Sequence, residues 1–368
     1  MALKGSIRRM FLGGNTAEGF FSFFNYLIEP DAARILVLKG GPGVGKSFFM
    51  RRIAETMLER GYDVEAHHCS SDSGSLDGVA IPAIRVALVD GTAPHVVDPK
   101  YPGCVDEIIN LGDYWDEAEL RAGKARILRV TREVGRSFAR AYRYLRAAKA
   151  VHDDWESVYT ENLNPAVANA KAAALIEEII PAAGKPGVAG KERHLFGSAI
   201  TPDGPVNFLD TLIEPLAAKY VLKGEPGTGK STLLVKVAAA AVAKGYDVEM
   251  FHCSLDPRRI EHLAIGELGV GVTVAAEPHI APVTNVRRVI NMNDCIDMEA
   301  AEQTADLLSD NRRLCSELID RAVEAVAQAK KLHDVLEAYY VPHMDFAAIG
   351  ALREKTLDRI FADVKAFR

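Results

Sequence analysis

The stretch Arg34-Ile35-Leu36-Val37-Leu38-Lys39 runs directly into Gly40-Gly41-Pro42-Gly43-Val44-Gly45-Lys46-Ser47, and together they decide the fold. The first part is an apolar run of the length of a strand, and it predicts a buried strand. Glycines then allow a tight turn. A helix is expected from Ser47 to Arg60, ended by Gly61. A buried strand, a glycine turn and a helix in this order indicate an α/β domain.

This pattern occurs twice. Gly224-Glu225-Pro226-Gly227-Thr228-Gly229-Lys230-Ser231 follows 184 residues after the first copy. At the same offset Gly61–Glu65 returns as Gly245–Glu249, and His68-Cys69-Ser70 returns as His252-Cys253-Ser254. Further along the offset becomes 181, and His152-Asp153 returns as His333-Asp334. A repeat of this length predicts two whole domains rather than a solenoid of small units.

The expected organisation is repeat 1 at residues 1–183, a Gly/Pro-rich linker at 184–192 and repeat 2 at 193–368. Val64–His68 and Arg85–Asp90 read as further buried strands, and strands alternating with helices favour a mostly parallel sheet. After Asp113 apolar residues recur every three or four positions over a long span. Each repeat is therefore predicted to be an α/β domain with a long helical appendage.

Composition restricts the partners and the compartment. The net charge of −6 and the pI near 6.0 give no footprint for nucleic acid or an anionic membrane. Five sparse cysteines imply no disulfide framework, no apolar stretch approaches a membrane span, and the first residues lack a signal peptide pattern. A cytoplasmic protein is expected, whose partners are a nucleoside triphosphate and an unidentified small-molecule acceptor or protein.

Both glycine turns match G-x-x-x-x-G-K-S/T, the phosphate-binding loop. Successive backbone N–H groups in such a turn form a cradle for anions, and the positive end of the following helix adds to it. Lys46 and Lys230 are expected to reach the β- and γ-phosphates, and Ser47 and Ser231 to bind Mg²⁺. The expected binding residues extend to Phe48 in the first loop and Thr232 in the second.

With these two motifs the chain resembles the P-loop NTPase superfamily, and most of it is similar to an uncharacterised group of bacterial tandem P-loop ATP-binding proteins. The resemblance implies two P-loop NTPase domains that bind ATP or GTP with Mg²⁺. The group implies no substrate beyond the nucleotide.

Val86–Asp90 resembles a Walker B strand, whose aspartate would hold Mg²⁺ through water. Gly91 follows, where hydrolytic relatives carry a glutamate. In repeat 2 the corresponding stretch is Val272–Glu277, where the aspartate is missing and Glu277 is a displaced substitute. The hypothesis is that the two sites are unequal, the first being more complete.

Asp72 and Asp256 follow the second strand in both repeats. Each is either a catalytic or acceptor-binding carboxylate or the first residue of an Asx turn. The turn is favoured at Asp256 because Pro257 follows, and for Asp72 both interpretations stay open.

Three weaker patterns have ordinary structural explanations. Asn110-x-x-Asp113 and Asn291-x-x-Asp294 both lack the lysine of a guanine-reading motif. Asp113 is better explained as a helix cap, so ATP is preferred and GTP stays open. His68-Cys69 and His252-Cys253 offer zinc ligands, but neither half has paired cysteines. His152, Glu156 and Tyr159 share a helix face that His333, Glu337 and Tyr340 reproduce. An inherited contact between helices is favoured over a histidine that acts as acid or base near a phosphate.

The sequence favours an ATP-binding protein that hydrolyses ATP at one or both sites and couples nucleotide state to a domain or partner rearrangement. Lys46, Asp90, Asp72 and Lys230 are the catalytic candidates, and Ser47, Asp90 and Ser231 the metal ligands. The alternatives are a small-molecule or nucleotide kinase and a nucleotide-binding scaffold with little turnover.

Overall fold

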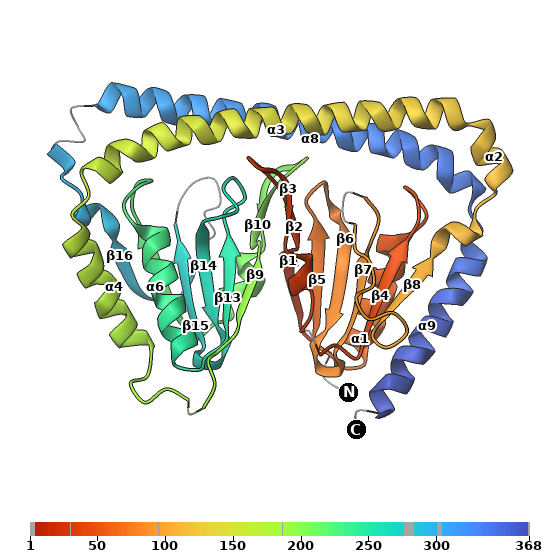
Figure 1. Ribbon diagram of the computed structural model, residues 1–368, viewed down its shortest axis with the longest axis horizontal. Coiled ribbons are helices and arrows are strands. Elements are labelled where there is room, and N and C mark those ends of the chain that lie inside the picture. The colour runs from red at the N-terminus through yellow and green to blue at the C-terminus, as the bar shows by residue number, and fades with distance from the viewer. Residues whose placement is uncertain are drawn as a thin grey trace.

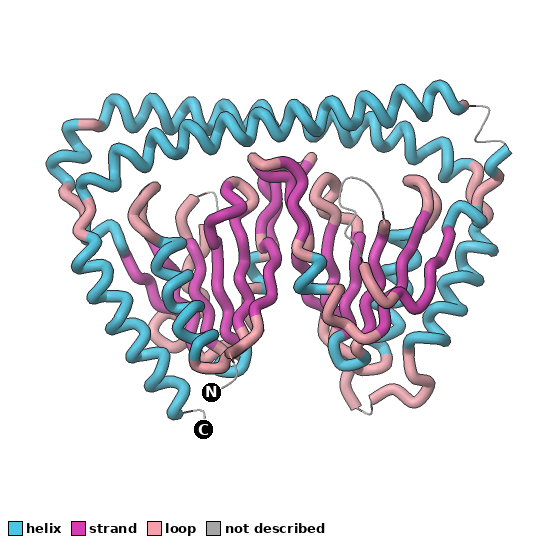
Figure 2. The backbone as a smooth tube through the Cα atoms, turned by 180° about the vertical axis from the view of Figure 1, so that it is seen from behind, coloured by secondary structure: helices cyan, strands magenta, loops and turns pink. Residues whose placement is uncertain are grey.

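The computed structural model describes residues 4–29, 31–93, 96–185, 187–275, 283–299 and 304–366, with side chains to 362. Two α/β bodies stand side by side beneath a pair of long helices that runs across both (Figure 1). The view from behind shows the same arrangement, with a strand-rich centre and helices along the top and both flanks (Figure 2). The described helices include none long and apolar enough to span a bilayer.

The first body is built on a six-stranded, mostly parallel sheet that contains the three predicted strands. In sheet order the strands are β1 (Ile7–Phe11), β5 (Val64–Cys69), β6 (Asp72–Ile81), β7 (Val86–Asp90), β4 (Arg34–Lys39) and β8 (Asp106–Asn110). All neighbours pair in parallel except β6, which is antiparallel to both β5 and β7. The sequence analysis missed β6, because its first half, Asp72–Ser75, is polar and reads as a loop.

The second body repeats this sheet. Its strands are, in order, β16 (Val286–Asn291), β12 (Ala218–Lys223), β15 (Val270–Val274), β14 (Ile260–Ile265), β13 (Val248–His252) and β9 (Glu192–Leu195), with β14 antiparallel to its neighbours. Two hairpins, β2–β3 (Gly13–Thr16, Gly19–Ser22) and β10–β11 (Ser198–Thr201, Gly204–Asn207), lie between the sheets (Figure 1). Both bodies are therefore mixed α/β with mostly parallel sheets.

One helix follows each glycine turn and packs on its sheet: α1 (Lys46–Glu59) and α6 (Lys230–Ala243). In α1 the buried residues Phe49, Met50, Ile53 and Met57 recur every three to four positions, the spacing of one helix face. Short helices are α2 (Glu117–Ala122) and α5 (Leu209–Leu212), with 3₁₀ turns η1 (Phe24–Tyr26), η2 (Pro82–Ile84), η3 (Leu111–Tyr114), η4 (Gly266–Leu268), η5 (Met292–Cys295) and η6 (Val341–His343).

The helix cap predicted at Asp113 was wrong. Asp116 caps α2 by accepting hydrogen bonds from the backbone N–H groups of Ala118 and Glu119. Asp113 instead lies within the preceding 3₁₀ turn, where its carboxylate accepts a hydrogen bond from Asn110 Nδ2 at 2.6 Å. The cap was predicted three residues too early, because both aspartates precede the same acidic segment.

The two repeats exchange their C-terminal helices. The long helices α3 (Lys124–Glu161) and α8 (Ala305–Tyr340) pack along each other and carry each repeat across to the other body (Figure 1). The helix after α3, α4 (Pro165–Ile179), then packs on α6 of repeat 2. The helix after α8, α9 (Phe346–Ala366), packs on α1 of repeat 1.

The exchange closes both apolar cores. Leu175 and Ile179 of α4 are buried in one cluster with Leu234 and Val237 of α6. Ile349 and Ile360 of α9 are buried in one cluster with α1 and β4 of repeat 1. Each core is thus covered by a helix that belongs to the other repeat. The bodies cannot separate without exposing this apolar surface to water.

The edge strands β1 and β9 meet at the centre of the molecule. Phe11 and Phe196 exchange backbone hydrogen bonds of 2.9 and 3.0 Å. Around them Met10, Leu195, Phe208 and Phe251 form a buried cluster with members from both repeats. Because equivalent residues face each other here, the repeats are related by an approximate two-fold axis that passes between the two phenylalanines.

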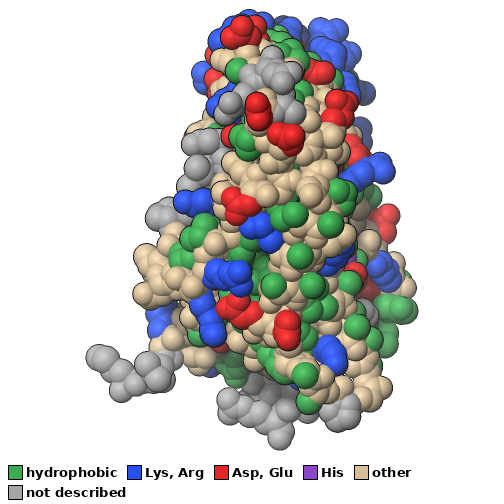
Figure 3. Space-filling view, turned by 90° about the vertical axis from the view of Figure 1, so that its left-hand side faces the viewer, with side chains coloured by type: hydrophobic (Ala, Val, Ile, Leu, Met, Phe, Trp, Pro, Cys, Tyr) green, Lys and Arg blue, Asp and Glu red, His purple; other side chains and the backbone are tan. Residues whose placement is uncertain are grey.

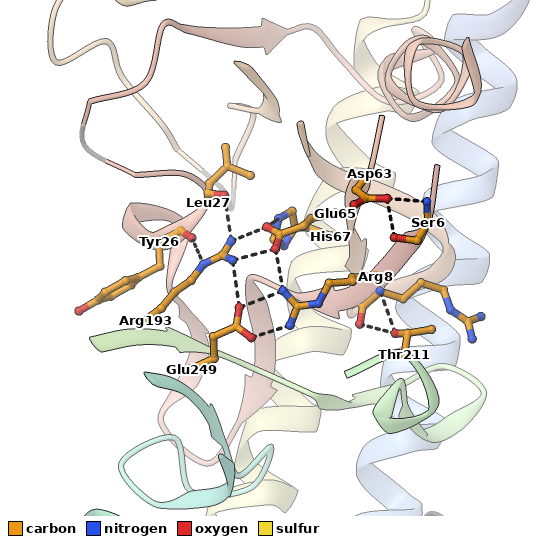
Figure 4. Close-up of polar contacts among 11 residues, drawn as sticks. Ser6, Arg8, Tyr26, Leu27, Asp63, Glu65, His67, Arg193, Thr211 and Glu249 are labelled. Atoms are coloured by element: carbon orange, nitrogen blue, oxygen red, sulfur yellow. Dashed lines mark hydrogen bonds and ion pairs between the residues drawn. The ribbon is translucent and has the colours of Figure 1, made fainter. Parts of the chain in front are cut away.

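A ring of four charges, two from each repeat, lies across this axis (Figure 4). Arg8 and Arg193 occupy equivalent positions, as do Glu65 and Glu249. Arg193 donates to Glu65 at 2.7 and 2.9 Å and to Glu249 at 3.2 Å, and Arg8 contacts the same two carboxylates. Burial raises the pKa of Glu65, but the Arg193 and Arg8 guanidinium groups outweigh it and hold that pKa below its ordinary value.

We expect the exchanged helices to stabilise the body they cover rather than the repeat they belong to. Ile360→Ala, a truncation of a fully buried side chain, should cost about 2–5 kcal/mol of unfolding free energy and raise amide hydrogen exchange in α1. Leu175→Ala is the matched variant and should raise exchange in α6. Exchange increases confined to the variant's own repeat would contradict the swapped packing.

Replacing Glu65 should destabilise the protein more than replacing its counterpart Glu249. The Glu65 side chain is 7% exposed and that of Glu249 21%, and removing one partner of a buried pair costs about 3–5 kcal/mol. Because the folded pKa of Glu65 is lowered, its stabilising effect is present above pH 4.5 and lost as the pH falls through the folded pKa.

The measurement is chemical denaturation of Glu65→Gln and Glu249→Gln at neutral and acid pH. The unmodified protein should lose stability below about pH 4.5 more steeply than Glu65→Gln does. If the unfolding free energies of the unmodified protein and of Glu65→Gln fell in parallel as the pH is lowered, protonation of Glu65 would not be linked to folding.

Candidate phosphate-binding sites

Both glycine turns lie between a strand next to the edge of their sheet, β4 or β12, and the following helix. In the first loop Gly40, Gly43 and Gly45 have φ of 151°, 69° and 88°, a region that side chains disfavour. In the second loop Gly224, Gly227 and Gly229 have φ of 148°, 81° and 87°. The two loops thus share one backbone conformation, although their intervening residues differ.

The loop lysines fold back over their own loops. Lys46 Nζ donates to the carbonyl oxygens of Gly40 and Gly41 at 2.9 Å each. Lys230 Nζ donates to those of Gly224 and Glu225 at 2.7 and 2.5 Å. Burial lowers the pKa of Lys230 to about 8, although the carboxylates of Glu225, Glu156 and Glu261 oppose the shift. Both ammonium groups therefore lie against backbone carbonyl oxygens at the start of their own loop.

The other predicted binding residues complete the two loops. Val44 and Thr228 are equivalent and fully buried, and Thr228 Oγ1 donates to the carbonyl of Glu225 at 2.8 Å. Phe48, in the first turn of α1, is 59% exposed. The predicted set Gly40–Phe48 and Gly224–Thr232 forms two continuous segments, each running from a strand end into a helix. Pro42 and Pro226 lie within the turns.

The serine hydroxyls are held by the antiparallel strands. Ser47 Oγ accepts a hydrogen bond from the N–H of Leu76 at 2.9 Å, and Ser231 Oγ accepts one from the N–H of Ile260 at 3.2 Å. In each repeat the next residue is acidic, Asp77 on β6 or Glu261 on β14. Sequence analysis missed this pair, although the offset of 184 that relates the phosphate loops also relates these two residues.

Asp90 lies where a metal-binding carboxylate is expected. Its Oδ2 is 3.6 Å from Lys46 Nζ, and its Oδ1 accepts a hydrogen bond from the N–H of Thr92 at 2.8 Å. In repeat 2 the strand register places Val274 at the same position. Glu277 lies outside the described residues. The described parts of the two sites therefore differ at this point.

Asp72 and Asp256 are engaged by the long helices. Asp72 Oδ1 accepts from the N–H of Gly74 at 3.2 Å, and Asp256 Oδ1 accepts from that of Arg258 at 3.2 Å. Both aspartates therefore form the Asx turns that the sequence suggested. Lys330 of α8 lies 3.5 Å from Asp72 Oδ2, and Lys149 of α3 lies 3.2 Å from Asp256 Oδ2. Each ion pair joins one repeat to the long helix of the other.

The long helices also contact the phosphate loops. A side chain at Gly227 would begin 2.4 Å from the carbonyl oxygen of Glu156, on α3 of repeat 1. A side chain at Gly43 would begin 3.3 Å from the Cα of Glu337, on α8 of repeat 2. A side chain at Gly41 would begin 2.8 Å from the ring of Tyr340, also on α8. Each loop is therefore covered by the long helix of the other repeat, a relation that no local pattern reveals.

The covering helices share one motif. Lys, His, Asp, Glu and Tyr recur with the same spacing in both, as Lys149, His152, Asp153, Glu156 and Tyr159 in α3 and as Lys330, His333, Asp334, Glu337 and Tyr340 in α8. The sequence interpretation, a contact between helices, was incomplete. The face is turned toward the phosphate loop of the opposite repeat. Its lysine was missed although it recurs at the same offset of 181.

The surroundings of Glu156 are charged and enclosed. Its Oε1 accepts a hydrogen bond from Arg259, which follows the end of β13 in repeat 2. Its Oε2 is buried, has no hydrogen-bond partner among the described residues, and lies 4.0 Å from His152 Nδ1. Burial lowers the pKa of His152, which favours the neutral imidazole. At the first loop His333 Nε2 lies 3.6 Å from Glu337 Oε1.

The histidine–cysteine pairs make other contacts. His68 Nδ1 bonds with the carbonyl of Ser73 at 2.8 Å, and His252 with the carbonyl of Pro257 and with His194. Burial raises the pKa of the Cys69 and Cys253 thiols well above the ordinary value, which disfavours the thiolate that zinc prefers. Within the described ranges the group of potential ligands close enough to hold an ion is His152, Asp153 and Glu156.

Charges are mixed on the face that α4 and β16 present. Figure 3 shows basic, acidic and hydrophobic side chains interspersed there rather than gathered by kind.

Asn110 and Asn291, considered for guanine recognition, each cap a 3₁₀ turn and bond to Asp113 or Asp294. The structure thus gives both asparagines a local backbone role.

Comparison with known proteins assigns no relative. No protein-family model matches this chain, and neither does a curated protein or a solved structure. What the chain does must therefore be argued from its own two loops and the residues around them.

Proposed function

We propose that the protein binds ATP with Mg²⁺ at both glycine loops and hydrolyses it. The supporting observation is that the two loops share one backbone conformation. In each, the lysine ammonium donates to a carbonyl oxygen of the loop that precedes the helix. Backbone N–H groups and a helix N-terminus favour anions, and a lysine there supplies the charge that β- and γ-phosphates require.

The oxygen donors at the first loop suit Mg²⁺. Ser47 follows Lys46 and offers a hydroxyl, and Asp90 offers a carboxylate 3.6 Å from the Lys46 ammonium. Mg²⁺ prefers one or two such ligands with substrate phosphates and water. Ser231 is the corresponding hydroxyl in repeat 2. The metal would neutralise charge that develops on the phosphates. Val274 in place of Asp90 supports the hypothesis that the second site holds the metal less firmly.

ATP is the nucleotide we propose, since the asparagines that suggested guanine recognition serve as caps. The helix contacts on both loops favour coupling between nucleotide state and the arrangement of α3 and α8. A group that binds at a loop changes the energy of every contact that the loop makes, so a ligand that prefers one arrangement shifts the population toward it.

The proposal is tested by ADP release from ATP and Mg²⁺. Lys46→Ala and Lys230→Ala should each lower turnover, and the double variant should abolish it. Because Asp90 has no counterpart in repeat 2, Lys46→Ala should cause the larger loss. Equal losses would contradict unequal sites. Tight binding without ADP release would contradict hydrolysis and favour a kinase whose acceptor is missing or a scaffold. GTP run in parallel tests the base preference.

Nucleotide binding at the second loop should take up protons at alkaline pH. The pKa of Lys230 is about 8 in the free protein, and phosphate charge beside the ammonium raises it. In Lys46→Ala, calorimetric titration with a non-hydrolysable ATP analogue should therefore show close to one proton taken up at about pH 9 and little at about pH 7. Lys230→Ala is the control. Uptake that is the same in both variants would exclude Lys230 as its source.

A further inference from the structure

Hydrolysis needs a carboxylate or similar base to take a proton from water, and neither body offers one in the usual place. Gly91 follows Asp90, and Val274 and Ala275 occupy the corresponding positions in repeat 2. Asp77 and Glu261 follow the residues whose N–H groups contact the two serines, but each faces a buried thiol, Cys69 or Cys253, and adds to the rise in pKa that burial causes there. The carboxylates that stand over the loops come from the long helices instead.

At the second loop the arrangement is well defined. Glu156 belongs to repeat 1, its side chain is 14% exposed, and its backbone lies against Gly227. Its charge acts directly on Lys230, the lysine that would hold the phosphates. Arg259 fixes one carboxylate oxygen, and the other has no hydrogen-bond partner among the described residues. A carboxylate with one oxygen anchored and one uncommitted can accept a proton from a positioned water.

The first loop has the equivalent group with a simpler environment. The backbone of Glu337, from repeat 2, lies against Gly43, and its carboxylate is paired with His333. Lys330 and Asp72 lie near enough to influence its charge. Both glutamates thus stand in the same relation to a phosphate loop that belongs to the opposite repeat. A contact kept in both copies at this spacing is what a shared chemical role requires.

We propose that Glu156 is the general base of the repeat 2 site and Glu337 that of the repeat 1 site, so that each active site is built from both repeats. This inference rests on the proposed ATP hydrolysis. The glutamate takes a proton from water as the water oxygen forms a bond to the γ-phosphorus. The bond from that phosphorus to the β,γ-bridging oxygen breaks, its electron pair leaves with ADP, and inorganic phosphate is the second product.

The test is a crossed set of variants. In Lys46→Ala, residual turnover comes from the second site and should fall by about 10²-fold or more with Glu156→Gln, but not with Glu337→Gln. In Lys230→Ala the pattern should reverse. A glutamate that served its own repeat would give the opposite pattern. Turnover unchanged by either substitution, or lost instead with Glu261→Gln, would also overturn the assignment.

Binding and folding are measured on the same samples. Affinity for a non-hydrolysable ATP analogue should stay within about threefold, because the substitution removes a proton acceptor rather than a phosphate contact. Glu156→Gln removes the ion pair with Arg259 and could destabilise the protein. Among the described residues Glu337 is paired only with His333, so Glu337→Gln still tests the proposal at the first site in that case. Glu161→Gln, exposed and off the shared face, is the matched control.

The two proposals fail differently. Absence of ADP release by the unmodified protein overturns hydrolysis and the general base together. Normal release that survives both glutamate substitutions overturns the general base alone and leaves ATP hydrolysis standing.

Discussion

The constraint on which the structure depends is the reciprocal burial of one helix from each repeat in the core of the other. Ile360 of α9 and Leu175 of α4 are almost fully buried against helices α1 and α6, which belong to the opposite repeat. Apolar surface of this kind stabilises only while it stays out of water, at about 25 cal/mol per Å². The two bodies are consequently bound to each other more firmly than a surface contact between domains would require.

The exchange dictates where the long helices lie, and hence what stands over the phosphate loops. To reach the opposite core, α3 and α8 must cross the molecule, and both end beside a loop that is not their own. Lys149 and Lys330 fix this placement through Asp256 and Asp72. In the same way, Arg8 on β1 and Arg193 on β9 each contact a glutamate of both repeats, so the charge ring holds the two edge strands together. The topology therefore places residues of both repeats at each glycine loop.

Much of the local structure could be predicted from sequence. The strand at Arg34–Lys39, the glycine turn and the helix after it are encoded by neighbouring residues, and the repeat located the second copy. The antiparallel strand β6 was not predicted, because its first residues, Asp72–Ser75, show no alternation of apolar and polar side chains. The exchange of α4 and α9 could not be predicted, because a helix with one apolar stripe packs equally well on either equivalent sheet and only the length and direction of α3 decide between them.

The same argument explains why the candidate site was only half found. Sequence motifs record neighbours in the chain, and Lys46, Ser47 and Asp90 all belong to one sheet and the helix beside it. Glu337 is almost three hundred residues from Gly43 in the chain, and no residue near Gly43 predicts that the two are in contact. The signal was nevertheless in the sequence, since a surface helix need not keep five polar residues at fixed spacing in both copies. A polar face retained by both halves of a duplicated chain indicates a shared contact, and here that contact is with the glycine loop across the axis.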